Sequence, residues 1–254
     1  MIIEYHRPTE IETALVLLAR LEPRTVPLGG GTSLNQSAPG EFAVIDLQAL
    51  GLKEIQSSGS RIVIGACVTL QMLVDTAGLP AGLQEVAGKE TTYNLRQLAT
   101  VAGTLVAADG RSPFTTGMLA LDAEVEFRLK GADSNRIALG DLLPFRPERL
   151  KGALITQVSL PARVHLAYAG VGRTPSDWPV VCAAVARWPS GRTRLALGGW
   201  GNAPLLAMDG PEPGGLEMAA RQAYLRASDE WASAEYRSEI AAVLASRCLE
   251  ELTQ

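Results

Sequence analysis

The 254-residue sequence predicts an α+β protein in which short strands and amphipathic helices alternate. Three observations support this class. Residues 9–12 (Thr-Glu-Ile-Glu) form a capping-box pattern ahead of a helical run of apolar residues. Apolar segments flank two tight turns, at 58–60 and 189–191, as in β-hairpins. Near the C-terminus, residues 232–252 carry apolar side chains at spacings of three and four.

The first half of the chain yields a clear series of elements. Apolar residues at helical spacing follow the capping box, namely Ile11, Ala14, Leu15 and Leu18. The next expected elements are strands at 24–28 and 42–47, hairpin arms at 53–57 and 61–66, helices at 69–76 and 80–89, a helix at 114–121 and a strand at 123–129.

The second half is expected to contain one further hairpin and two helices. The hairpin arms are 180–188 and 193–199, and the helices cover 216–227 and 232–252. The intervening Asp209-Gly-Pro-Glu-Pro-Gly-Gly215 is predicted to be a linker. The glycines at 198, 199 and 201 are interpreted as a tight turn between packed elements.

Composition and charge exclude several functional classes. A net charge of −4 without a basic stripe gives no reason to expect a nucleic acid partner. The N-terminal residues lack a signal-peptide layout and no apolar run reaches the length of a membrane span, so we expect a cytoplasmic protein without membrane partners. Three isolated cysteines and two distant histidines do not supply the ligand groups of a zinc site or an iron–sulfur cluster, and no metal site is expected.

Two glycine-containing segments indicate a site where another group comes close to the backbone. Residues 27–36 read Pro-Leu-Gly-Gly-Gly-Thr-Ser-Leu-Asn-Gln, and residues 100–113 are rich in small side chains. Such segments allow main-chain N–H groups to face an anionic ligand, although two unrelated tight turns would look the same. The GxxxxGK[ST] pattern of the ATP-type P-loop and the GxGxxG pattern of the dinucleotide-binding fold are both absent. A phosphate site here would therefore belong to neither of these two folds.

An ordered series of motifs resembles one family. Gly30-Gly-Thr-Ser-Leu34 is similar to the first flavin loop of the medium, FAD-binding subunits of molybdenum hydroxylases, the group of carbon monoxide dehydrogenase and xanthine dehydrogenase. Asn94-Leu-Arg-Gln-Leu-Ala-Thr-Val-Ala-Gly-Thr104 is similar to the second loop. The C-terminal motifs Arg173-Thr-Pro-Ser-Asp177, Leu197-Gly-Gly-Trp-Gly-Asn-Ala-Pro204 and Ala232-Ser-Ala-Glu-Tyr-Arg237 follow in the order of that family.

This resemblance implies a fold and a domain organisation. We expect a two-lobed FAD-binding domain of the vanillyl-alcohol-oxidase (PCMH) type at 1–156, with lobes of about 1–52 and 53–156. A smaller α+β domain of the carbon monoxide dehydrogenase flavoprotein type would follow at 157–254. The implied activity is that of an oxidoreductase component, in which FAD takes electrons from a partner and passes them to NAD, a quinone or oxygen.

The resemblance also implies partners and cofactor contacts. The partners would be a large molybdenum-cofactor subunit and a small subunit with [2Fe–2S] clusters, in a hetero-oligomer. No side chain is expected to be a catalytic acid or base. The residues expected to contact FAD are Gly29, Gly30, Gly31, Thr32, Ser33, Leu34, Thr100, Ala102, Gly103 and Thr104.

The sequence departs from the family pattern at a few positions. Ala102 replaces a glycine and Thr104 an asparagine, and Pro113 stands where the family has an aspartate that holds a flavin-chain hydroxyl. Asp109 or Ser112 is expected to take over that contact. Two alternatives remain at this point: a flavin-free scaffold subunit of the same complex, and a stand-alone FAD reductase.

Overall fold

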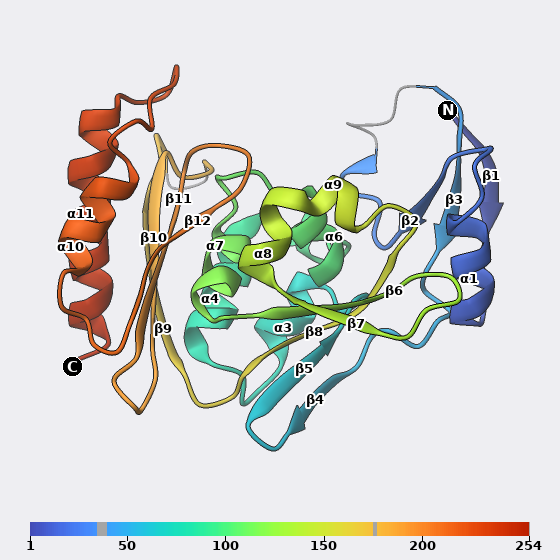
Figure 1. Cartoon of the computed structure of the whole chain (residues 1–254), viewed down its shortest axis with the longest axis horizontal. Helices are drawn as coiled ribbons and strands as arrows, with labels where there is room; N and C mark the ends of the chain where they lie inside the picture. Colours follow the sequence, from blue (N-terminus) through green and yellow to red (C-terminus); the bar gives the residue numbers. More distant parts are fainter. Residues whose placement is uncertain (35–39, 175–176, 254) are drawn as a thin grey trace. The chain divides into compact units, whose positions relative to one another are not determined.

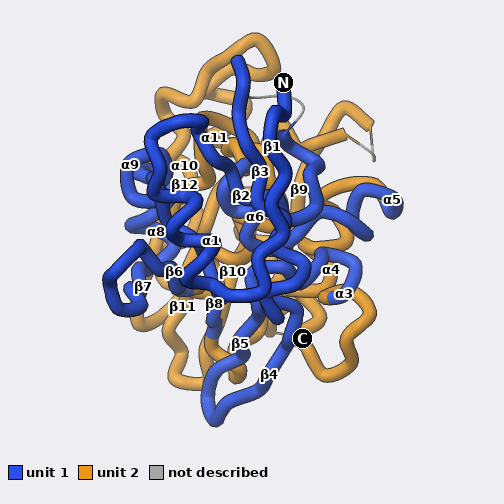
Figure 2. Tube along the Cα trace, turned by 90° about the vertical axis from the view of Figure 1, so that its right-hand side faces the viewer, with its two compact units in different colours: residues 1–72, 93–107, 124–160 blue, residues 73–92, 108–123, 161–254 orange. Residues whose placement is uncertain are grey.

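The computed structural model describes residues 1–34, 40–174 and 177–253, which form two compact units (Figure 2). Unit 1 comprises residues 1–72, 93–107 and 124–160, and unit 2 comprises 73–92, 108–123 and 161–254. Each unit combines three separate segments of the chain. The domain division at 156/157 stays a prediction. Residues 35–36 of the first glycine segment and residues 175–176 of the Arg173 motif lie outside the described part of the chain.

Unit 1 begins with a three-stranded parallel sheet in the order β1-β3-β2 (Figure 1). Its strands are β1 (Ile2–His6), β2 (Thr25–Leu28) and β3 (Phe42–Asp46). Helix α1 (Ile11–Leu18) connects β1 to β2 and buries Ala14, Leu15 and Leu18 in a cluster with Ile45 and Leu47 of the β3 segment. The predicted helix and the two predicted strands are confirmed, and β1 is an additional strand.

The start of α1 differs from the predicted capping box. The N-cap residue is Glu10 rather than Thr9, and no side chain caps the helix there. The helix therefore begins one residue later than the box requires, and the Thr9 hydroxyl is not at the position from which it could accept an N3 amide proton. Burial of one apolar face accounts for the helix without a cap.

The second sheet of unit 1 has five strands in the order β4-β5-β8-β6-β7. The predicted hairpin is β4 (Ile55–Ser58) and β5 (Arg61–Gly65), with Gly59 at φ +61° in its turn. The other strands are β6 (Glu124–Arg128), β7 (Asn135–Ala138) and β8 (Leu154–Pro161). Short helices complete unit 1: α5 (Tyr93–Arg96), α6 (Val101–Ala107), α8 (Leu139–Leu142), the 3₁₀ turn η1 (Leu143–Phe145) and α9 (Arg146–Arg149). Helix α3 (Leu70–Asp75) begins in unit 1 and ends in unit 2.

Unit 2 is built on a four-stranded antiparallel sheet in the order β12-β11-β10-β9. Helices pack on both faces of this sheet (Figure 1): α10 and α11 cover one face, and α4 and α7 the other. The strands are β9 (His165–Val171), β10 (Val181–Arg187), β11 (Thr193–Gly198) and β12 (Leu205–Gly210). The helices are α4 (Ala81–Glu90), α7 (Pro113–Ala120), α10 (Leu216–Ala223) and α11 (Ala234–Glu251).

The core of unit 2 explains why its strands tolerate so many alanines. Alanines of α11 and of β10 face one another across a fully buried interface, which allows the helix to lie close to the sheet. Tyr224 is buried in the same cluster, and its hydroxyl donates a 2.8 Å hydrogen bond to the carbonyl of Gly198. The sheet therefore forms a rigid support for the loops at its edge.

The predicted linker at 209–215 is wrong at its first residues. Asp209 and Gly210 end strand β12, and the Asp209 carboxylate accepts hydrogen bonds from Arg192 and Arg194 of the neighbouring strand segment. Cross-strand ion pairing extends the sheet into a stretch whose glycines and prolines suggested a loop. None of the helices among the described residues combines the length and apolar character needed to cross a membrane.

Candidate functional site: two glycine loops in unit 1

The first glycine loop continues directly from strand β2. The carbonyl of Leu28 accepts a 3.1 Å hydrogen bond from Leu47 N, which keeps the chain paired with the β3 segment up to the first glycine. Gly31 has φ +75°, a conformation that residues with a side chain rarely adopt, and Leu34 N then donates to its carbonyl at 3.4 Å. All residues from Gly29 to Leu34 are half-buried.

The second loop leads into helix α6, whose first amides are all paired within the chain. Thr100 caps the helix, because its Oγ1 accepts a 3.2 Å hydrogen bond from Gly103 N. Val101 N donates to the carbonyl of Val68 at 2.8 Å, and Ala102 N donates to that of Ala66 at 3.2 Å. Since these amides are already used, the N-terminus of α6 offers few donors to a ligand.

The substitution of Ala102 for the family glycine is compatible with this geometry. Ala102 lies in the right-handed helix α6 and is not among the residues with positive φ. A methyl group is normally accommodated in such a conformation. Thr104 N donates to the carbonyl of Thr100 at 2.8 Å as part of the same helical turn.

The two loops press against each other, and this contact requires the glycines. A Cβ atom on Gly29 would lie 2.7 Å from Thr100 Oγ1, and a Cβ atom on Gly30 would lie 1.7 Å from the carbonyl oxygen of Leu98. The sequence predicts a close approach at these glycines and attributes it to the diphosphate. The neighbour that the structure shows at Gly29 and Gly30 is the second loop.

The first loop nevertheless presents donors suited to an anion. Among the described residues, no acceptor is hydrogen-bonded to the backbone N–H of Gly30, Gly31, Thr32 or Ser33. Successive unpaired N–H groups in a glycine turn form a concave site for phosphate oxygens, and neighbouring hydroxyls extend it. The residues present therefore fit the diphosphate of FAD, although the individual contacts assigned from the sequence stay predictions.

Asp109 and Ser112 belong to unit 2, and both take part in local hydrogen bonds. Asp109 Oδ1 accepts a 2.8 Å bond from Arg111 N. Ser112 is 1% exposed and caps α7, where its Oγ accepts from Thr115 N at 3.0 Å. Its hydroxyl also lies 2.8 Å from Glu90 Oε2, to which it donates. The assignment of a flavin contact to either residue stays a prediction, and Ser112 has a structural role that the sequence did not reveal.

Glu90, at the C-terminal end of α4, is a buried carboxyl that sequence reasoning missed. Its Oε2 accepts hydrogen bonds from Ser112 Oγ at 2.8 Å and from Phe114 N at 2.9 Å, and its backbone carbonyl accepts from Trp178 Nε1 at 3.0 Å. Burial raises the pKa of Glu90 to about 7, although the two hydrogen bonds oppose the shift. Only the tertiary fold reveals this residue, because its sequence neighbours Lys89 and Thr91 indicate an exposed helix end.

The described part of the chain contains no group of histidine, cysteine, aspartate and glutamate residues that could hold a metal ion. All three cysteines are buried and unpaired. Burial raises the pKa of the Cys67 and Cys182 thiols to about 11 and that of Cys248 to about 12. These thiols are therefore protonated at neutral pH, as structural cysteines are.

Comparison with known proteins connects this geometry to a family. The family described as the FAD binding domain in molybdopterin dehydrogenase matches residues 1–163. The uncharacterized protein YgfM of Escherichia coli K12 is 30% identical over 250 residues, which cover 96% of this chain and 94% of YgfM. The carbon monoxide dehydrogenase medium chain of Afipia carboxidovorans is 28% identical over 280 residues, covering 97% and 95% of the two chains.

Solved structures agree with this assignment. A chain of the cyanide-inactivated Cu,Mo-CO dehydrogenase superposes with a TM-score of 0.84 at 25% identity, covering 98% of this chain and 97% of the other. A chain of quinoline 2-oxidoreductase from Pseudomonas putida 86 has the same fold, with a TM-score of 0.80 at 22% identity and coverage of 98% and 95%. The predicted fold class and family are thereby confirmed. The chain belongs to the family of FAD-binding domains of molybdopterin dehydrogenases, and its cofactor is FAD.

Proposed function

We propose that this chain is the FAD-binding electron-transfer subunit of a molybdenum hydroxylase-type oxidoreductase. In this role it receives electrons from the iron–sulfur clusters of a partner subunit and passes them to an external acceptor. The observation that carries the proposal is the row of backbone N–H groups at Gly30–Ser33 that have no acceptor among the described residues, next to a second loop that contributes no acid or base. Such a site binds a cofactor and leaves the chemistry to it.

The residues of the two loops have distinct roles in this proposal. The N–H groups from Gly30 to Ser33 bind the diphosphate, and the hydroxyls of Thr32 and Ser33 add further donors. The second loop holds the first in place through the contact of Leu98 with Gly30. When bound, FAD supplies the one- and two-electron redox chemistry that links a cluster to an acceptor.

The partners are proposed from the relatives. The carbon monoxide dehydrogenase relative is a medium chain, which implies larger and smaller chains in that enzyme. By this likeness, a molybdenum-cofactor subunit and a [2Fe–2S] subunit would assemble with the present chain. The substrate would then be oxidised on the molybdenum subunit rather than here.

A stand-alone reductase is the second candidate, and one feature of the loops disfavours it. Such an enzyme needs a proton donor beside its flavin. Residues 28–34 and 98–104 contain no Asp, Glu, His, Cys, Lys or Tyr. A flavin-free scaffold is disfavoured by the family membership and by the amides of the first loop, for which the described residues supply no acceptor.

The decisive experiment combines a spectrum with turnover. The purified chain is expected to show a flavin spectrum, to be reduced by dithionite and to be reoxidised by an acceptor. It is expected to oxidise no purine, aldehyde or aromatic thioester until the molybdenum and iron–sulfur subunits are added. Steady turnover of an organic substrate by this chain alone, at roughly 1 per second or faster, would establish the stand-alone reductase instead.

A further inference from the structure

Two arginines of unit 2 converge on one exposed tryptophan. The guanidinium carbon of Arg111 lies 4.4 Å from the centroid of the Trp231 ring, and that of Arg173 lies 4.3 Å from the same centroid. Both distances are typical of cation–π contacts. The two positive charges therefore share one aromatic ring, although they come from segments that are far apart in the sequence.

In the described part of the chain, these two charges have no carboxylate partner. Among the described residues, neither Arg111 nor Arg173 forms an ion pair. Arg111 donates to the backbone carbonyls of Pro179 at 3.1 Å and Trp178 at 2.8 Å, which are neutral acceptors. Like charges held together without a counter-ion repel each other, so an external anion would be attracted to this place.

Three nearby aspartates accept hydrogen bonds from groups other than the guanidinium groups of Arg111 and Arg173. Asp109 accepts from Arg111 N, Asp177 accepts from Thr174 N, and Asp229 accepts from Trp231 N, Ala232 N and Arg237. Glu230, next to Trp231 in the sequence, is exposed. These acidic groups shape the loops that carry the arginines and the tryptophan, without forming an ion pair with Arg111 or Arg173.

A second cluster of arginines beside a tryptophan in the same unit has its positive charges paired with carboxylates. Arg192 lies 4.8 Å from the Trp188 ring centroid, and Arg194 shares its carboxylate partner Asp122. There, however, the carboxylates of Asp122 and Asp209 bridge the two arginines at 2.6–3.1 Å. The comparison identifies two neighbouring carboxylates as the chemistry that is missing at Trp231.

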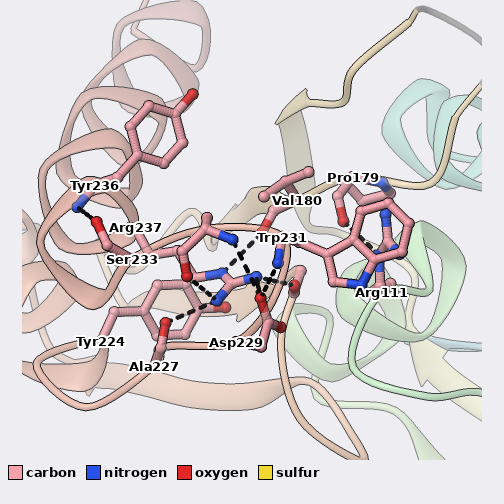
Figure 3. Close-up of polar contacts among 12 residues, drawn as sticks. Arg111, Pro179, Val180, Tyr224, Ala227, Asp229, Trp231, Ser233, Tyr236 and Arg237 are labelled. Carbon is pink, nitrogen blue, oxygen red and sulfur yellow. Dashed lines mark hydrogen bonds and ion pairs between the residues drawn. The ribbon is translucent and has the colours of Figure 1, made fainter.

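The cluster at Trp231 is held on a rigid support (Figure 3). Arg237 is fully buried and donates to the carbonyls of Val180 at 3.1 Å, Ala227 at 2.8 Å and Ala232 at 3.0 Å. It also binds the Asp229 carboxylate at 2.7 Å. One side chain thus fixes both the loop of Trp231 and the strand next to Pro179, which lowers the entropic cost of binding a partner there.

We propose that Arg111, Arg173, Trp178 and Trp231, called here the Trp231 patch, form a docking surface for a protein partner that presents two neighbouring carboxylates. The proposal rests on the function proposed above and places the partner within that complex. Trp231 is 39% exposed, and Trp178, whose backbone carbonyl accepts from Arg111, is 44% exposed, so both segments of the patch carry an aromatic side chain that a partner can contact. A small dianion would leave this surface in water, whereas a protein face covers it, and tryptophan and arginine dominate the binding energy of protein interfaces.

The test compares two variants of the patch with matched controls in the same unit. Arg173→Glu reverses one unpaired charge, and Arg247→Glu makes the same change at an exposed position of α11. Trp231→Ala removes the ring, and Met218→Ala truncates an apolar side chain of α10 that is 61% exposed. The dissociation constant of each variant for the purified molybdenum and iron–sulfur subunits is measured at low and high salt, together with flavin content and unfolding midpoint.

The expected result is a loss of affinity of at least about tenfold for one partner subunit in both patch variants, with less salt dependence in Arg173→Glu. The controls should bind like the parent, and flavin content should be unchanged in all four.

Parent-like affinity of folded patch variants overturns the docking surface and leaves the proposed function intact. Failure of the parent chain to bind either subunit overturns both. A selective loss of affinity for pyrophosphate or NAD, with subunit binding retained, would identify a small-anion site instead.

Discussion

Glu90 illustrates how a single buried residue can make the stability of this protein depend on pH. The raised pKa of about 7 means that the folded state holds the proton on Glu90 more tightly than the unfolded chain does, where the ordinary value is 4.5. Below about pH 4.5 the carboxyl is protonated in both states. As pH rises from there to 7, the unfolded chain loses its proton first, and folding stability falls by up to roughly 3 kcal/mol in total.

Glu90→Gln should remove this dependence. The amide keeps an acceptor for Ser112 and Phe114 and cannot ionise, so it imitates the protonated acid. We expect its free energy of unfolding to match that of the parent near pH 4.5 and to exceed it by up to about 3 kcal/mol above pH 7. Urea unfolding between pH 4.5 and 8 measures the difference. Glu250→Gln, at an exposed site of α11, is the control, and parallel pH curves for Glu90→Gln and the parent would contradict the buried, protonated carboxyl.

The cysteines allow a second prediction at this scale. Cys67, Cys182 and Cys248 are buried, and their pKa values of about 11, 11 and 12 leave almost no thiolate at neutral pH. Because the thiolate is the reactive species, a thiol reagent such as DTNB should label none of them in the native protein within minutes. All three should react in denaturant. Rapid labelling of any one in the folded protein would show that its surroundings open more easily than the packing indicates.

At the scale of elements, the contact between the two glycine loops governs cofactor binding. Gly30→Ala would place a Cβ atom 1.7 Å from the Leu98 carbonyl, so the loops must separate. We expect a loss of roughly 1–3 kcal/mol of folding stability and at least a tenfold loss of FAD affinity, because the row of N–H groups moves with the loop. Denaturant unfolding and flavin titration measure the two effects.

Gly88→Ala supplies the control for that experiment. Gly88 lies inside helix α4, and a Cβ atom there would meet only a methyl group of Val74, at 3.9 Å. Alanine is the better helix former, so this variant should gain about 0.5–1 kcal/mol and keep its FAD. If Gly30→Ala behaved like Gly88→Ala, the close approach of the loops would not exist in solution.

The sequence predicts elements well where the apolar pattern is local. Helix α1 and the hairpins β4–β5 and β10–β11 follow from periodicity and turn residues within a few positions. Strands β7, β8, β9 and β12 are not among the elements that the sequence predicts, because they depend on pairing with β6, β10 and β11 rather than on their own pattern. Asp209 shows the reason, since its cross-strand partners Arg192 and Arg194 are distant in sequence and close only in the sheet.

At the scale of the whole molecule, the sequence identified the family and the cofactor better than it described the contacts. The glycines and Thr100 were recognised as a site because their order along the chain resembles one family. That Thr100 caps α6 and that Leu98 abuts Gly30 are facts of tertiary packing, which no single motif contains. Glu90 and the Trp231 patch were invisible for the same reason, since their members come from separate segments.

FAD should stabilise the folded chain, because it binds only when the two glycine loops are in contact with each other. The two loops come from residues 29–34 and 98–104, which unfolding would separate, so the unfolded chain has no site for the cofactor. At a free FAD concentration about 1,000 times the dissociation constant, linkage predicts roughly 4 kcal/mol of added stability. For a chain of this size that corresponds to a rise of about 8–16 °C in the midpoint of thermal unfolding, if the molecule unfolds in one step.

Calorimetry of the FAD-depleted protein with and without added FAD tests this prediction and also reports on the two units. Both loops belong to unit 1. If the units unfold in separate transitions, FAD should therefore raise mainly the transition of unit 1, with a smaller rise for unit 2 through the predicted contact of Asp109 or Ser112. A single transition that shifts as a whole would show that the units unfold together. Gly30→Ala should shift much less, and Arg247→Glu should shift like the parent. An unchanged midpoint at saturating FAD in the parent chain would contradict a cofactor site formed by the joined glycine loops.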